Sequence, residues 1–114
     1  MQPISGDSLR GHLGTMVLSV LERGEAHGFE VWRRLEKAGC GALTLKEGSL
    51  YPALYRLEKN GFVKAQWEKG NSQRRGPRRR IYRLTAKGKR NLSDGRQQWM
   101  HFTTIIGAIV GAPS

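Results

Sequence analysis

Five arginines lie within residues 74–80, and their side chains have the chemistry to hold phosphate. They are Arg74, Arg75, Arg78, Arg79 and Arg80, set around a Gly-Pro pair that is typical of a turn. A guanidinium donates hydrogen bonds in a planar fork that matches phosphate oxygens, and cations this close repel one another unless an anion lies between them. The cluster predicts a site for a polyanion; a solvated, flexible surface is the alternative that composition alone leaves open.

A second set of hydrogen-bonding side chains lies upstream, on one side of a predicted helix. In residues 47–61, Leu50, Leu54 and Leu57 recur at helical spacing, so this side can be buried, and Asn60-Gly61 ends the helix. The opposite side carries Pro52, Tyr55, Arg56 and Lys59, with Ser49 and Tyr51 on its flanks. Such a face suits a helix that enters an anion-rich groove, while an ordinary amphipathic helix with a solvated face is the other interpretation.

The charge of the whole chain also favours a polyanionic partner. Its 114 residues carry 20 Lys and Arg against 9 Asp and Glu, a formal charge of +11. Residues 64–90 hold eleven of these bases and a single acid, Glu68. An imbalance of this size points to nucleic acid, an anionic membrane surface or an acidic protein as partner.

No group of residues resembles an active site or a metal site. His12, His27, Cys40 and His101 are scattered without the paired spacing of zinc ligands, and no Gly-rich loop follows a strand. We therefore expect neither an enzyme nor a bound metal or cofactor. A single cysteine excludes an intrachain disulfide and fits a reducing compartment.

The chain shows no signal peptide and no membrane span. The longest mostly apolar run, residues 99–112, is shorter than the roughly 20 residues that a spanning helix needs. The start of the chain lacks the basic segment and apolar run of a secretory signal. We therefore expect a soluble, cytoplasmic protein that does not bind membranes.

The remaining patterns predict the elements that position these residues. Helical spacing predicts helices over residues 5–23 and 27–38, and glycines inside the first suggest close packing against another helix. Residues 43–45 could form a small strand. Alternation predicts strands over residues 63–68 and 79–84 around a turn at 70–77. The predicted fold is mainly α with a small β-hairpin, in the order of a winged helix-turn-helix.

Thr85 caps a predicted last helix that is too apolar to be left in water. Its apolar side chains at helical spacing are Trp99, Phe102, Ile105, Ile106, Ile109 and Val110. Three short helices and a hairpin cannot cover this surface. We therefore expect it to meet a second subunit.

Several blocks of sequence, in order, resemble the PadR family of bacterial transcriptional regulators in its short form. The resemblance extends over about residues 9–98. Its blocks are His27-Gly28-Phe29-Glu30, Glu47-Gly48-Ser49-Leu50-Tyr51-Pro52-Ala53-Leu54, Arg56-Leu57-Glu58, Gly61-Phe62-Val63 and Gly76-Pro77-Arg78-Arg79-Arg80-Ile81-Tyr82-Arg83-Leu84-Thr85-Ala86-Lys87-Gly88. The tail at residues 104–112 departs from the family, because it is more apolar and richer in glycine.

The resemblance implies a homodimeric repressor that binds a palindromic operator in double-stranded DNA. The helix over residues 49–59 would enter the major groove, and the arginines of residues 74–80 would hold phosphate or minor groove. Residues 5–85 would form the DNA-binding part and residues 86–112 a dimerisation helix, together one structural unit. The implied dimer residues are Leu13, Val17, Trp99, Phe102, Ile106, Ile109 and Val110.

Some short members of the family also bind planar hydrophobic effectors between their subunits. Trp99 is our candidate for such a site, and a core position for Trp99 is the alternative. Two other functions stay open: a nonspecific or architectural nucleic-acid binder, and a basic module that binds an acidic protein. The varied side chains at Ser49, Tyr51 and Tyr55 argue against purely nonspecific binding, because contact with phosphate alone needs only Lys and Arg side chains.

Overall fold

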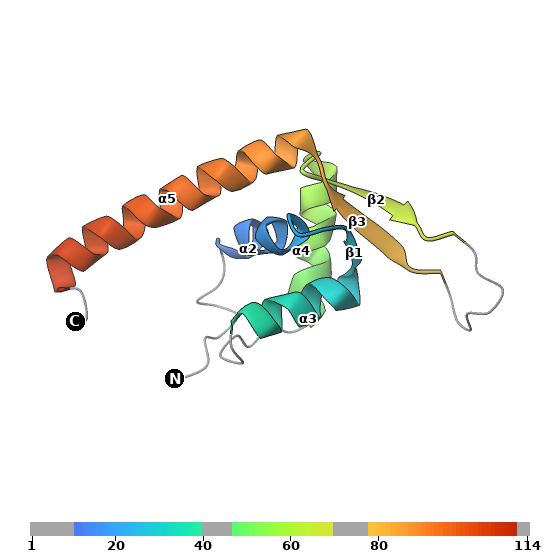
Figure 1. The fold of residues 1–114 in the computed structure, drawn as a ribbon, viewed down its shortest axis with the longest axis horizontal. Coiled ribbons are helices and arrows are strands. Elements are labelled where there is room, and N and C mark those ends of the chain that lie inside the picture. Colours follow the sequence, from blue (N-terminus) through green and yellow to red (C-terminus); the bar gives the residue numbers. More distant parts are fainter. Residues whose placement is uncertain (1–10, 40–46, 70–77, 112–114) are drawn as a thin grey trace.

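The computed structural model describes residues 11–39, 47–69 and 78–111, with the side chain of Glu47 left out. Its elements, in chain order, are α2 (Leu13–Leu21), β1 (Ala26–His27), α3 (Gly28–Ala38), α4 (Glu47–Lys59), β2 (Val63–Trp67), β3 (Arg80–Leu84) and α5 (Ala86–Val110). Figure 1 shows α2, α3 and α4 packed together, a hairpin of β2 and β3 that projects from one end, and α5 crossing above them and extending past the opposite end. The described order of helices and hairpin is the predicted one.

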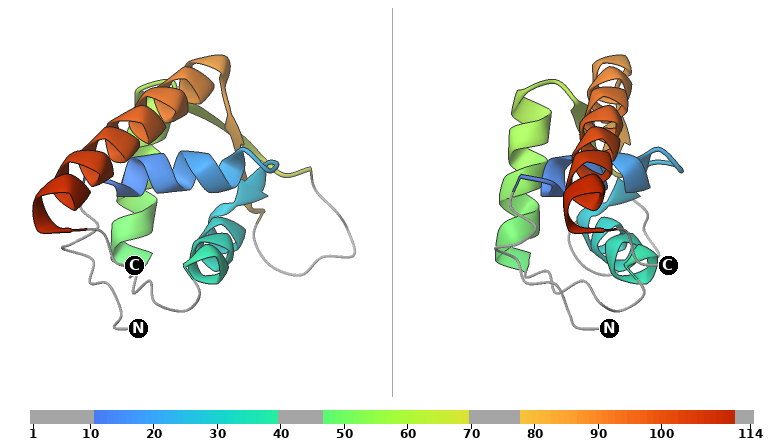
Figure 2. Two further views of the ribbon diagram at one scale, coloured as in Figure 1. Left: turned by 60° about the vertical axis from the view of Figure 1, so that its left-hand side comes forward. Right: turned by 90° about the vertical axis from the view of Figure 1, so that its left-hand side faces the viewer.

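The core is built around α2, which contacts α3, α4 and α5 (Figure 2). Every helix and the first hairpin strand contribute to it. The large side chains with almost no exposure are Val17, Leu18, Val31, Leu50, Leu54, Val63 and Leu92. Each contributes about 1.5–3 kcal/mol of hydrophobic stabilisation by leaving water. The predicted apolar side of α4 is therefore confirmed, since Leu50, Leu54 and Leu57 are all buried.

Local capping fixes where the elements begin and end. Gly61 adopts a positive φ of 80° after α4, and the Phe62 N–H donates to the Leu57 carbonyl at 2.9 Å, as in a Schellman motif. The Thr85 hydroxyl accepts from the Gly88 N–H at 3.0 Å and so caps α5, as predicted. His27 caps α3 in the same way, with Nδ1 accepting from the Glu30 N–H at 3.2 Å.

The sheet has one strand more than the predicted hairpin. Its order is β1-β3-β2, all antiparallel, with Ala26 opposite Tyr82 and His27 opposite Ile81. The hairpin pairs from Val63 and Leu84 out to Trp67 and Arg80. A two-residue strand has no alternation to read, so β1 was not expected.

Some sequence expectations need correction, and others concern residues outside the description. The first helix does not run unbroken from residues 5–7, because Gly11 has a positive φ of 95° and α2 begins only at Leu13. The alternation of the strand over residues 63–68 predicts Trp67 on the same side as Val63, but Trp67 is 60% exposed, because it lies beyond the last core residue of β2. The possible strand at 43–45, the turn at 70–77 and Cys40 lie outside the described residues.

Candidate nucleic-acid interface

The side of α4 opposite its leucines presents the predicted set of hydrogen-bonding residues to solvent. Tyr51 is 48% exposed and Tyr55 65%, while Pro52, Arg56 and Lys59 are exposed and Ser49 is half-buried. Within the described chain, neither Arg56 nor Lys59 has a side-chain ion pair or hydrogen bond. This face is therefore available to an outside partner.

Tyr51 also has a structural role that its sequence position did not reveal. Its ring lies over Gly28, the first residue of α3, and a Cβ built at Gly28 would stand 2.7 Å from Tyr51 Cε1. Only glycine permits this approach, so the pair seats the start of α4 on the start of α3. Half of the ring remains exposed, which leaves an edge for a second contact.

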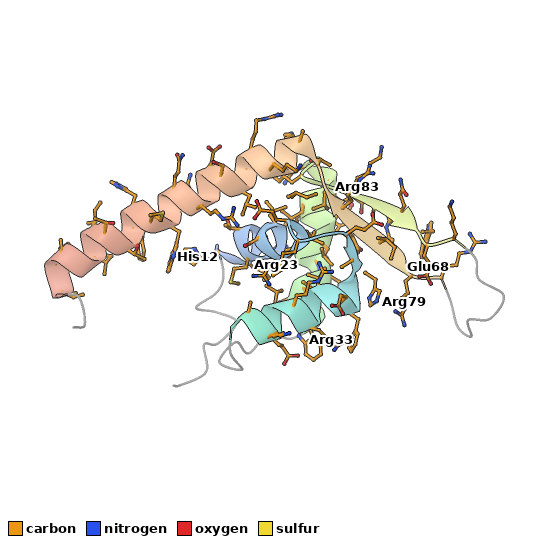
Figure 3. The ribbon with its side chains drawn as sticks, viewed as in Figure 1. His12, Arg23, Arg33, Glu68, Arg79 and Arg83 are labelled. Atoms are coloured by element: carbon orange, nitrogen blue, oxygen red, sulfur yellow. The ribbon has the colours of Figure 1, made fainter. Side chains whose placement is uncertain are left out.

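The predicted arginines of the hairpin differ from one another in the structure. Arg78 is exposed and, in the described residues, has no side-chain partner. Arg79 is exposed too (Figure 3), and its Nη1 lies 2.7 Å from His27 Nε2. Arg80 is half-buried, with Nη2 2.5 Å from Glu58 Oε2 on α4. Arg74 and Arg75 lie outside the described residues.

Two further basic residues belong to this surface; they were counted among the eleven of residues 64–90 but not proposed as DNA contacts. Lys64 and Arg83 are Cα partners in the hairpin, and both are exposed. Like charges directly opposite each other destabilise a strand pair, so an anion between them would relieve the repulsion. The signal was present in the alternation, which places both bases on the outer side of their strands.

The titratable groups with shifted pKa values serve the scaffold. Burial raises the pKa of the Tyr82 phenol, which lies in the core. The hydrogen bond from Arg96 lowers the pKa of the Glu22 carboxyl, and the same bond raises the pKa of Arg96. This exposed pair ties α5 to the end of α2. No group of three metal-ligating residues exists within residues 11–39, 47–69 and 78–111.

The far half of α5 carries an apolar surface that nothing in the described part of the chain covers. Its exposed members are Trp99, Met100, Phe102, Ile105, Ile106, Ile109 and Val110. Trp99 stacks on Phe102 with ring centroids 5.8 Å apart and makes a T-shaped contact with the His12 ring at 5.3 Å between centroids. Trp99 is 49% exposed, so it is not a core residue of one subunit. The described helices include none that is long and apolar enough to cross a membrane.

Leu13 and Val17 do not share this exposure. Val17 is fully buried and Leu13 is 9% exposed, because α2 is enclosed by three other helices. The expectation that both contact a second subunit is therefore corrected: they are core residues of the single chain. The other five predicted dimer residues, all on α5, remain exposed.

Comparisons of the sequence point to one class of protein. The model of the transcriptional regulator PadR-like family matches residues 17–94. An uncharacterized protein X of Lysinibacillus sphaericus is 28% identical over 103 residues, which are 90% of this chain and 92% of that protein. The transcriptional regulator YqjI of Escherichia coli K12 is 27% identical over 88 residues, 77% of this chain and 39% of YqjI.

Comparisons of the structure agree. A transcriptional regulator from Clostridium thermocellum matches with a TM-score of 0.82 and 32% identity, over 94% of this chain and 98% of that one. A PadR-like transcriptional regulator from Bacillus cereus matches with a TM-score of 0.76 and 29% identity, over 95% and 100%. The predicted fold, a winged helix-turn-helix with a long C-terminal helix, is confirmed.

Proposed function

The chain belongs to the PadR-like family of transcriptional regulators, and from this premise we propose that it is a homodimeric repressor of a palindromic operator. Membership of the family makes the protein a DNA-binding regulator of transcription and confirms that it is not an enzyme. The finer claims concern which helix reads sequence, how two chains pair and what releases the DNA.

The observation that carries the proposal is the division of α4 into a buried and an exposed side. The leucines hold the helix on the core, while Tyr55, Arg56 and Lys59 stand free in solvent. Arg donates in a bidentate manner to guanine in the major groove, and a tyrosine hydroxyl donates or accepts, so this face has the chemistry for reading base edges. The bases of the hairpin, Arg78 and Arg83 among them, would add affinity through phosphate.

The apolar surface of α5 supports the homodimer. Five predicted residues, Trp99, Phe102, Ile106, Ile109 and Val110, are all at least 40% exposed in one chain. Burying them against a twin helix is favourable at about 25 cal/mol per Å² of apolar surface. A two-fold dimer would place two copies of α4 about one turn of DNA, roughly 34–36 Å, apart, which is what a palindromic site requires.

A flat hydrophobic effector would bind where the two subunits meet. Trp99 is half-exposed and already stacked on Phe102, so the exposed part of this aromatic pair offers a surface to a planar ligand. In a variant with Trp32 and Trp67 replaced by phenylalanine, planar aromatic compounds should quench Trp99 fluorescence, and in the wild type the same compounds should weaken operator binding. Absence of quenching across a chemically broad panel would assign Trp99 to subunit packing alone.

Selection from random DNA duplexes tests the proposed function. The full-length protein should enrich one sequence motif with two-fold symmetry, and a reporter gene placed behind that motif in a bacterial cell should be transcribed less when the protein is present. A protein that enriches no motif would be a nonspecific or architectural binder. One that binds no DNA while it binds acidic proteins would be the interaction module.

A further inference from the structure

The ion pair between Glu58 and Arg80 joins the two parts of the candidate interface. Glu58 lies in the last turn of α4, and Arg80 is the first residue of β3. Their side chains are 31% and 40% exposed, and Arg80 Nη2 donates to Glu58 Oε2 at 2.5 Å. A hydrogen bond between two charged groups is about twice as strong as a neutral one.

Trp67 covers the same guanidinium. Trp67 and Arg80 are Cα partners in the hairpin, and Arg80 Cζ lies 5.6 Å from the centroid of the Trp67 ring. Tryptophan attracts a cation more strongly than any other aromatic side chain. Arg80 Nε is buried and, in the described residues, has no hydrogen-bond partner, so this side chain has already given up part of its hydration.

The cluster stands where the hairpin loses the support of the third strand; farther out, Arg79 Nη1 still contacts His27 Nε2 at 2.7 Å. The third strand, β1, pairs with β3 only at Tyr82 and Ile81. At Arg80 the sheet has therefore become a two-stranded ribbon, which is marginally stable in water by itself. Contacts made at Arg80 therefore control the angle between the outer part of the hairpin and α4.

We propose that the Glu58–Arg80–Trp67 cluster fixes the angle between the hairpin and α4, and that Arg80 is a positioning residue and not a phosphate ligand. The inference rests on the proposed function, because it concerns how two DNA-contacting parts are held for one operator. It separates Arg80 from Arg78 and Arg83, which are exposed and have no side-chain partner in the described chain. Arg80, although it belongs to a run of basic residues, would therefore stabilise the arrangement of the hairpin and not bind DNA.

Neutralising Glu58 gives a test in which a positioning role for Arg80 and a phosphate-binding role predict opposite changes in operator affinity. Removing an acid strengthens the attraction of a protein to any duplex. If Glu58 holds Arg80 in place, Glu58→Gln should instead lower operator affinity, by about three- to tenfold for a partly exposed charged pair. Affinity for a random duplex should stay equal or rise. The control Glu25→Gln removes the same charge from an exposed acid and should not lower operator affinity.

Variants of Arg80 complete the test. Arg80→Gln should lower operator affinity by a similar factor, and adding Glu58→Gln to it should lower the affinity little further, because both remove one interaction. In Arg78→Gln the slope of log K against log salt should fall by about 1 for the phosphate that the side chain no longer holds, and in Arg80→Gln by much less. The charge swap Glu58→Arg with Arg80→Glu should bind the operator more tightly than the doubly neutralised variant, because it restores an ion pair at the same place.

Three results would overturn the inference. They are equal or tighter operator binding by Glu58→Gln, a fall in salt slope in Arg80→Gln that matches Arg78→Gln, and additive effects in the double variant. Circular dichroism melting of each variant reports whether it folds, and Glu58→Gln keeps the shape of the side chain should the swap not fold. If the wild type prefers no sequence, the proposed function fails; the cluster is then judged by non-additive melting temperatures of the same two single variants and their double.

Discussion

Helices α4 and α5 are both amphipathic, and they treat their apolar sides in opposite ways. In α4 the leucines are buried within the chain, with Leu54 at 0% and Leu50 at 1% exposure, and the polar side faces out. In α5 only the first turns reach the core, through Leu92, and the far half leaves Ile109 74% exposed. A single chain buries the apolar side of α4 but leaves most of the apolar side of α5 exposed.

The difference identifies two kinds of partner from the same chain. An exposed face of Tyr, Arg and Lys gains by meeting anions and base edges, since each of its groups is a hydrogen-bond donor. An exposed face of Trp, Phe and Ile gains by leaving water. Under the proposed function, α4 meets DNA and α5 meets a second copy of itself, and changes to either face should affect different measurements.

The largest effect is expected where α5 would pair. Ile109→Glu places a charge in the apolar surface, and chains cut after Gln98 lack most of that surface. Either change should yield monomers, or poorly soluble protein, and reduce operator affinity by about 10²- to 10⁴-fold because the second half-site is no longer held. Sedimentation velocity and fluorescence anisotropy measure the two outcomes. Gln97→Glu, an equal charge on an exposed polar position of α5, is the control and should leave both unchanged.

The buried side of α4 should control folding. Leu54→Ala removes a side chain with no exposure and should lower the free energy of unfolding by about 2–5 kcal/mol. Urea unfolding followed by circular dichroism measures the change. A decrease below about 1 kcal/mol would contradict the core position. A drop in DNA affinity beyond the unfolded fraction would mean that this side also contacts DNA.

The exposed side of α4 should control specificity. Tyr55→Ala and Arg56→Ala should each reduce operator affinity by about 1–3 kcal/mol if the side chain reads a base edge, with little change for random duplex. Fluorescence anisotropy titrations with both duplexes give the ratio of operator affinity to random-duplex affinity for each variant. Equal reductions on operator and random DNA would show that α4 does not read sequence.

The smallest effect is expected from the hairpin bases. Arg78→Ala should weaken binding to every duplex alike and reduce the slope of log K against log salt by about 1 per phosphate released. Arg90→Ala removes a base from the start of α5 and serves as the control, with a smaller change in slope. A decrease in affinity confined to the operator would give the hairpin a role in sequence reading.

Features with local causes were predictable from the sequence. The leucine spacing of α4, the stop at Gly61 and the cap at Thr85 each depend on residues within one or two turns of chain. The helix over residues 27–38 was likewise predicted, and α3 spans Gly28–Ala38. The exposed face of α4 followed directly, because the side opposite a buried stripe must face outward.

Features with distant causes were not predictable. Strand β1 exists because Ala26 meets Tyr82, and the ion pair of Arg80 joins it to Glu58, 22 residues away. Val17 was assigned to a dimer contact, whereas three helices that pack on α2 enclose it. Periodicity indicates that a side chain is buried, but it does not indicate whether the side chain packs within its own chain or against a second subunit.

The mass of the protein, free and bound to its selected operator, tests the central claim most directly. Native mass spectrometry of the wild type should find two chains without DNA and two chains on one duplex that contains both half-sites. The same duplex with one half-site scrambled should bind much more weakly. A single chain bound at full strength, with indifference to the scrambled half-site, would contradict the account of a dimer in which α5 pairs and α4 reads.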